Sequence, residues 1–147
     1  MSSERRRAIA VHESGHAVAA WALFLPVERL WIDGGGGTSA GRASTIVDQI
    51  AVYWAGHKAT ILLGIDAPKE LAACDKTKVG ELVSSLSSDE ASRTVEAGGS
   101  RARELLSPNL EMLKVVAQEL DRVGAMDPVR FLEIAARCGN RQGLAPT

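Results

Sequence analysis

The chain has 147 residues, a length typical of one domain, and 46% of them are hydrophobic, which is enough to form a core. Its charged residues nearly cancel to a net charge of −1, so the composition gives no reason to expect a nucleic acid or an anionic membrane as a partner. No apolar run approaches the ~18 residues of a membrane span and the two cysteines form no C-x-x-C pair, so we expect a cytoplasmic protein with free thiols and no membrane insertion.

The first predicted element is an alanine-rich helix from about residue 3 to 25, which Pro26 ends. This helix contains the sequence H-E-S-G-H. His12 and His16 are one helical turn apart and therefore lie on one face, where two neutral imidazoles can bind one Zn²⁺. Glu13, turned by about 100° from His12, can act as the general base that activates water. Two histidines and a glutamate in such apolar surroundings would be costly unless paired, so the pattern favours a zinc site.

A short β-hairpin is predicted next, over about residues 27–45. Residues 27–32 are typical of a strand, the glycines at 34–37 of a flexible turn, and residues 41–45 of a second, shorter strand. No Gly-Lys-Ser/Thr sequence follows the glycines, which excludes a P-loop, and we expect no ATP binding. An exposed edge strand of this hairpin can hold an extended peptide by backbone hydrogen bonds beside the metal. The alternative is a hairpin that only covers the core.

The remainder of the chain is predicted to be helical. Helices are expected over about residues 46–63, 76–86, 88–106, 109–123 and 128–137. In the first of them, Ala55, Gly56 and Ala59 form a patch of small residues against which the histidine-bearing helix can pack closely. Gly15, which costs that helix about 1 kcal/mol relative to alanine, is expected to permit a close approach by the substrate or by a neighbouring element.

The expected fold class is therefore α+β and mostly α-helical. It combines a zincin-like helix, a small β-hairpin or sheet, and a C-terminal antiparallel helix pair. One domain is expected over residues 1–138, followed by a polar tail at 139–147.

A third zinc ligand has to come from elsewhere in the chain, because catalytic zinc sites use three protein ligands plus water. Asp75 ranks first, since a residue at the start of a short helix after a loop can point into a cleft, although capping that helix would also explain it. Asp66 and Asp89 follow, because each has a stronger capping explanation. Cys74 would form an unusual Cys/Asp ligand pair, and a lone histidine such as His57 is more often a core or surface residue than a ligand.

Four stretches of the chain share their pattern with one known family. They are R-R-R-A-I-A-V-H-E-S-G-H-A-V at 5–18, the strand and glycine-containing turn at 26–42, A-G-H-K-A at 55–59 and R-A-R-E-L-L at 101–106. Together they resemble the peptidase domain of the FtsH-type membrane AAA proteases, over nearly the whole chain. The resemblance implies that Asp75 is the third zinc ligand, because Cys74-Asp75 falls near that family's Asn-Asp pair. It places Asp89 in a later scaffold helix.

The resemblance also implies a substrate edge and an activity. In that family the strand and glycine turn lie at the edge of the active site, which assigns substrate binding to Trp31, Ile32, Gly41 and Arg42. Because the sequence shows neither the ATPase module nor a membrane anchor, we expect an ATP-independent peptidase with one Zn²⁺ per chain. It would hydrolyse peptides or unfolded protein segments. One departure from the family lies in the site itself, where Thr60 replaces a glutamate.

Two rival hypotheses are a proteolytically inactive zinc module that holds peptides or regulates a partner, and a scaffold protein without metal. Glu13 argues against the first rival, because a purely structural zinc has no need of that carboxylate. The hexamer of the FtsH-type enzymes is organised largely by their ATPase ring, so the sequence leaves open whether this chain forms a homo-oligomer.

Overall fold

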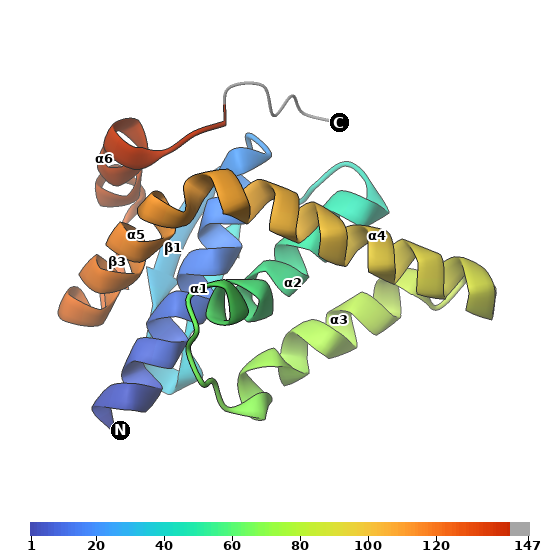
Figure 1. Ribbon diagram of the computed structural model, residues 1–147, viewed down its shortest axis with the longest axis horizontal. Helices are drawn as coiled ribbons and strands as arrows, with labels where there is room; N and C mark the ends of the chain where they lie inside the picture. The colour runs from blue at the N-terminus through green and yellow to red at the C-terminus, as the bar shows by residue number, and fades with distance from the viewer. Residues whose placement is uncertain (142–147) are drawn as a thin grey trace.

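The fold is organised around one buried helix. The computed structural model describes residues 1–141, and its first helix, α1 (Ser3–Ala22), lies among the other elements with the sheet behind it (Figure 1). Every residue from Ala8 to Ala22 is buried, as expected of a helix that is apolar on nearly all sides. The helix ends earlier than predicted because Phe24 adopts a left-handed φ of 63° ahead of Pro26.

A three-stranded antiparallel sheet covers one side of α1, with the strands in the order β2-β1-β3. The strands are β1 (Val27–Trp31), β2 (Gly37–Ala40) and β3 (Ala125–Met126). The predicted hairpin is present, but its second strand comes earlier than the expected 41–45. Three glycines with positive φ, at 34–36, reverse the chain within a short turn, so Gly37 already pairs with Trp31.

The third strand is an element that the sequence did not indicate. It contains only two residues, and its strand conformation comes from its partner in β1, where Leu30 pairs with Met126 and Trp31 with Ala125. The backbone N–H of Ile32 continues this pairing by donating to the carbonyl oxygen of Gly124. The sheet therefore joins the N-terminal hairpin to the C-terminal helices.

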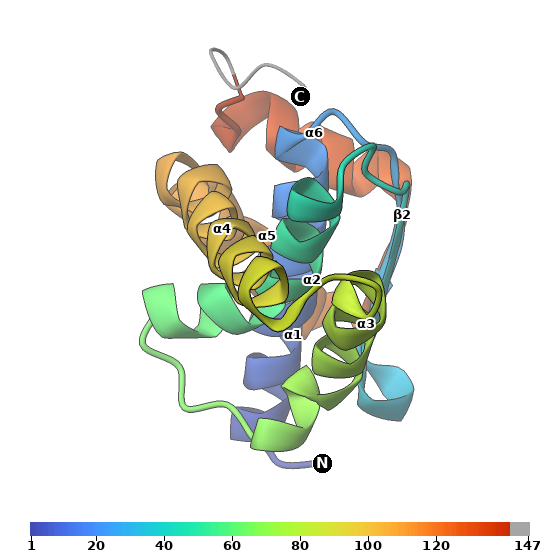
Figure 2. The same cartoon turned by 90° about the vertical axis from the view of Figure 1, so that its right-hand side faces the viewer.

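Five further α-helices complete the described chain. They are α2 (Ile46–Leu62), α3 (Ala73–Val83), α4 (Ser88–Leu106), α5 (Leu110–Val123) and α6 (Pro128–Cys138). Figure 2 shows the sheet edge at one side of the molecule and α4 at the other, with α2 between them. The predicted α+β, mostly helical class is confirmed, and α5 packs against α6 as the predicted C-terminal pair. Within residues 1–141 no helix is long and apolar enough to cross a membrane.

Small residues bring α1 and α2 into close contact. A Cβ atom added at Gly15 would lie 2.5 Å from the carbonyl oxygen of Ala55 and 2.6 Å from the Cβ of Ala59. The sequence left open whether Gly15 permits the approach of a substrate or of a neighbouring element. The neighbour that approaches Gly15 is α2. Any larger residue at this position would push α1 and α2 apart, and α1 carries two residues of the candidate metal centre described below.

Arg141, which follows α6, contacts residues at the end of α1. The guanidinium of Arg141 lies 4.6 Å from the ring centroid of Trp21 and 4.3 Å from that of Phe24, and it donates a hydrogen bond to the carbonyl oxygen of Trp21. The start of the predicted polar tail thus contacts the core. The rest of that tail, residues 142–147, lies outside the described residues.

Candidate metal centre

Three side chains of metal-ligand type converge beside α1. The Nε2 atoms of His12 and His16 lie 3.1 Å apart, and the Oδ2 of Asp75 lies 2.9 Å from the first and 3.1 Å from the second. All three residues are buried. Within residues 1–141 they form the one group of three or more His, Cys, Asp or Glu side chains that could hold a metal ion.

The fold brings Asp75, of the three aspartates weighed from the sequence, to the two histidines. Asp75 lies in the first turn of α3, which starts at Ala73, so it does not cap that helix. Asp66 is exposed and lines a different cavity, and Asp89 is exposed in the first turn of α4. Cys74 is exposed and His57 is exposed, and neither joins the group.

The spacing of the three ligand atoms fits a metal ion. Bonds of about 2.0 Å at tetrahedral angles place ligand atoms about 3.3 Å apart, close to the 2.9–3.1 Å seen here. Without a proton or a cation between them, the lone pairs of these atoms would face one another in a buried site. Two imidazole nitrogens and one carboxylate oxygen are also the donor set of catalytic zinc sites, which keep one position open.

A hydrogen bond to α2 determines which nitrogen of His16 faces the centre. The Nδ1 of His16 lies 2.7 Å from the carbonyl oxygen of Val52. Because a carbonyl oxygen only accepts, Nδ1 carries the proton and donates it. The Nε2 atom is then the one that faces Asp75 and the centre, as in metal sites where the second nitrogen of a ligating histidine is anchored by the protein.

The same contacts shift the pKa values of the metal-free group. Burial alone lowers the pKa of His16, but the hydrogen bond and charge of Asp75, with smaller effects of Glu13 and the Val52 carbonyl, raise it to about 9. Burial raises the pKa of the Asp75 carboxyl, but its bonds to both histidines and their charges bring it well below its usual range. At neutral pH the metal-free centre therefore holds a proton on His16 against an ionised Asp75.

The affinity for zinc is expected to rise with pH, by about tenfold per unit between roughly pH 6.5 and 8.5, because zinc must displace the proton on His16. In the metal-free protein, the raised pKa of His16 makes the stability of the fold decrease as the pH rises. Its contribution to stability is complete below the ordinary value of 6.5 and is lost as the pH rises toward about 9. Competition titrations against a zinc-binding dye at several pH values measure the affinity. A pH-independent affinity would contradict this protonation state.

Glu13 is positioned beside the ligands by the hairpin. The hydroxyl of Thr38 in β2 lies 2.9 Å from both the Oε1 atom and the carbonyl oxygen of Glu13. A Cβ added at Gly36 would lie 2.9 Å from the Oε2 of Glu13, so only glycine leaves room for the carboxylate here. The sequence did not single out Thr38 or Gly36, because their roles depend on how the hairpin lies against α1.

The backbone of α2 closes the centre on another side. A Cβ added at Gly56 would lie 2.6 Å from the Nε2 of His16 and 2.7 Å from the Nε2 of His12. Gly56 belongs to the small-residue patch that the sequence indicated for helix packing. Its contact with the ligand atoms themselves could not be read from that pattern.

A cleft of about 790 Å³ opens onto the centre. His12, Glu13, His16 and Asp75 line it, together with β2 and the glycine turn. Of the four residues expected at a substrate edge, Trp31, Gly41 and Arg42 line this cleft.

Ile32, the fourth of these residues, does not reach the cleft. Its side chain is fully buried in the hydrophobic core. Leu30 and Ile32, on either side of Trp31, are both fully buried, whereas Trp31 lines the cleft. We therefore give Ile32 no role in binding a substrate.

Thr60, which the resemblance to the FtsH-type enzymes sets in place of a glutamate, is buried in α2. Its hydroxyl donates a hydrogen bond to the carbonyl oxygen of His57, 2.6 Å away in the same helix. It is therefore satisfied locally and adds no charge to the centre. No known family model matches the chain, and no curated protein matches it.

Proposed function

We propose that this protein is a zinc metallopeptidase that hydrolyses peptide bonds in peptides or unfolded protein segments without ATP. The observation that carries the proposal is the buried triangle of His12, His16 and Asp75 with Glu13 beside it on the same helix. The cleft that opens onto these four residues gives a substrate access. The resemblance of the H-E-S-G-H helix and of Asp75 to the FtsH-type peptidase domain supports zinc as the metal and proteolysis as the activity.

Each residue of the centre would have a distinct role in such a reaction. His12, His16 and Asp75 would hold zinc, which when bound polarises the scissile carbonyl and lowers the pKa of a water toward ~7. Glu13 accepts the proton of the attacking water and returns it to the leaving amine. The hydroxyl of Thr38 holds the Oε1 atom of Glu13, which orients the carboxylate and leaves Oε2 for the proton.

The strand β2 is the proposed support for the substrate. It is an edge strand of the sheet, and its residues line the cleft beside the metal centre. An extended peptide can pair with the outer backbone edge of β2 and so pass the centre in a fixed register. Trp31, Gly41 and Arg42 lie along the same cleft and would contact its side chains.

Hydrolysis of unfolded casein is the test, with Asp75→Asn and Asp66→Asn as a matched pair of variants. We expect the zinc-loaded protein to cleave casein, a chelator to stop cleavage, and added zinc to restore it. The Asp75 variant should lose about 100-fold or more in zinc affinity, as removal of a ligand does, whereas the exposed Asp66 variant should match the native protein. One bound zinc per chain without cleavage would favour the inactive peptide-holding module. The absence of bound zinc would contradict both functions.

A further inference from the structure

A second cavity, of about 970 Å³, adjoins the metal centre. It is formed by His12 of α1, the second half of α2, the segment 65–72, the start of α3 and α4, and we call it the α2–α4 cavity. Its volume lies within the range of about 300–1,000 Å³ usual for sites of small molecules. The side chain of His12 lines both this cavity and the substrate cleft, whereas Glu13, His16 and Asp75 line the cleft alone. The proposed peptidase mechanism thus assigns no function to this space.

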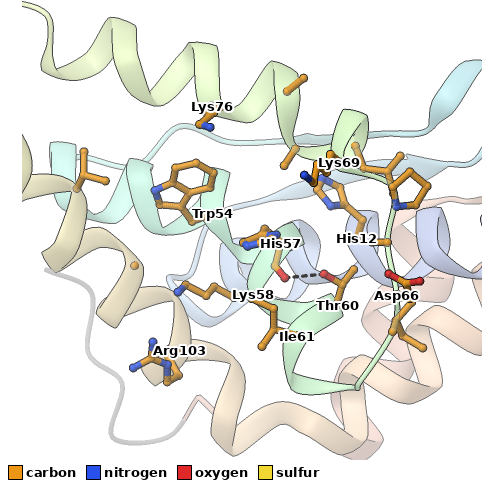
Figure 3. Close-up of a pocket in the computed structure, with 18 of the residues that line it drawn as sticks. His12, Trp54, His57, Lys58, Thr60, Ile61, Asp66, Lys69, Lys76 and Arg103 are labelled. Carbon is orange, nitrogen blue, oxygen red and sulfur yellow. Dashed lines mark hydrogen bonds between the residues drawn. The ribbon is translucent and has the colours of Figure 1, made fainter.

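The lining of the α2–α4 cavity carries an excess of positive charge. Its basic residues are Lys58, Lys69, Lys76 and Arg103, and its acidic residues are Asp66 and Glu96. Figure 3 shows Lys76 and Lys69 on one side of the cavity and Lys58 and Arg103 on the other. Within residues 1–141 none of these four cations forms an ion pair with a carboxylate. Unpaired cations that line a concave site are the usual means of binding an anionic group.

Apolar side chains lie among these cations. The apolar lining includes Trp54, Ile61, Ile65, Pro68 and Leu71. Trp54 is half-buried, and Figure 3 shows its ring between the two basic sides of the cavity. Ile61 keeps 59% of its surface exposed and adds apolar area to the lining. The cavity therefore offers an aromatic ring and apolar surface together with positive charge.

Lys58 is the cation best placed to hold a ligand. It is half-buried on α2, and its Nζ lies 3.9 Å from the position that a Cβ at Gly99 of α4 would occupy. The amine therefore extends to α4, and the missing side chain of Gly99 leaves space beside it. A half-buried amine is less screened by solvent than one on an open surface, so its pairing with an anion is stronger.

We propose that the α2–α4 cavity binds a small organic anion with an apolar, aromatic body. The body lies against Trp54, and the anionic group pairs with Lys58 and the neighbouring cations. His12 lines both spaces, so the cavity adjoins a residue that the proposed function assigns to the metal. The proposal does not depend on peptidase activity, since no other residue of that mechanism lines the cavity.

Calorimetric titration of the 147-residue chain with three probes tests this proposal. Anilinonaphthalene sulfonate carries both an aromatic body and an anionic group, phenyl-naphthylamine lacks the sulfonate, and inorganic phosphate lacks the body. We expect one sulfonate probe per chain, bound about tenfold or more tighter than the neutral probe, with phosphate weaker than either. Binding should persist after chelation of metal, so that a loss of peptidase function would not remove it.

Two variants and their matched controls locate the probe. Lys58→Met should weaken the sulfonate probe by about tenfold and leave the neutral probe unchanged, while Trp54→Leu should weaken both. The controls are Lys114→Met, on an exposed position of α5 that lines neither cavity, and Trp31→Leu in the substrate cleft.

Several results would overturn the assignment. Equal affinities for the sulfonate and neutral probes, or equal losses in Lys58→Met and Lys114→Met, would show that the cations of the cavity do not select an anion. Loss of binding in Trp31→Leu but not in Trp54→Leu would place the probe in the substrate cleft instead. Circular dichroism verifies each fold, and Lys58→Met with the two probes decides the question even where Trp54→Leu does not fold.

Discussion

Replacing Glu13 with glutamine is expected to leave zinc bound and to slow peptide cleavage by roughly 10²–10⁴-fold, the usual contribution of a general base. The amide has nearly the same shape as the carboxylate, and its oxygen can still accept the hydrogen bond from Thr38. It cannot accept the proton of the attacking water at neutral pH. Zinc content by elemental analysis and the rate of casein cleavage are the two measurements.

Glu70→Gln is the matched control for this variant. Glu70 also lines the cleft, but its carboxylate pairs with Arg5 and is exposed, at a distance from the three metal ligands. We expect this variant to cleave casein at the native rate. Undiminished turnover by Glu13→Gln, with zinc still bound, would rule out Glu13 as the base.

Adding one methyl group at Gly56 is expected to lower zinc affinity by about 100-fold or more. The new Cβ would lie 2.6 Å and 2.7 Å from the ligand nitrogens of His16 and His12, well inside van der Waals contact, so one or both imidazoles must turn away. The substitution otherwise favours the helix, since alanine is about 1 kcal/mol better than glycine in a helix interior. Loss of zinc from a protein with native circular dichroism would therefore identify a local effect at the centre.

Gly80→Ala provides the comparison for the Gly56 variant. Gly80 lies on α3, the helix that carries Asp75, and a Cβ there would meet no other atom within 4 Å. This variant should bind zinc as the native protein does and be slightly more stable. Native zinc affinity in Gly56→Ala would mean that the helices separate enough to accommodate the methyl group.

The parts of the fold that follow from local rules could be predicted. The sequence Ser87-Ser88-Asp89-Glu90 has the capping-box pattern at the start of the helix expected over 88–106, and the hydroxyl of Ser87 accepts a hydrogen bond from the backbone N–H of Glu90. Asp127 ahead of Pro128 likewise caps α6, accepting from the backbone N–H of Arg130. Such signals depend on residues a few positions apart, so tertiary packing does not override them.

The parts that depend on distant contacts could not be predicted as well. The position of β2 depends on how tightly three glycines turn, and that of β3 on its pairing with β1. Asp75 could be ranked among three aspartates, but its approach to His12 joins residues far apart in the chain. The α2–α4 cavity was not indicated at all, because its basic residues come from α2, α3, α4 and a short 3-10 helix at Lys69–Ala72, each unremarkable in sequence.

From Ala8 to Ala22 the helix α1 is buried on all sides. This stretch therefore forms the centre of the core and also carries His12, Glu13 and His16. A substitution between Ala8 and Ala22 that alters the size of a side chain therefore also alters packing against α2, α5 or the sheet. Evolution of this domain toward new substrates is therefore expected to leave the helix nearly constant and to act on exposed segments around it. The glycine turn before β2 and the segment 64–72 are such segments, and they border the cleft and the cavity respectively.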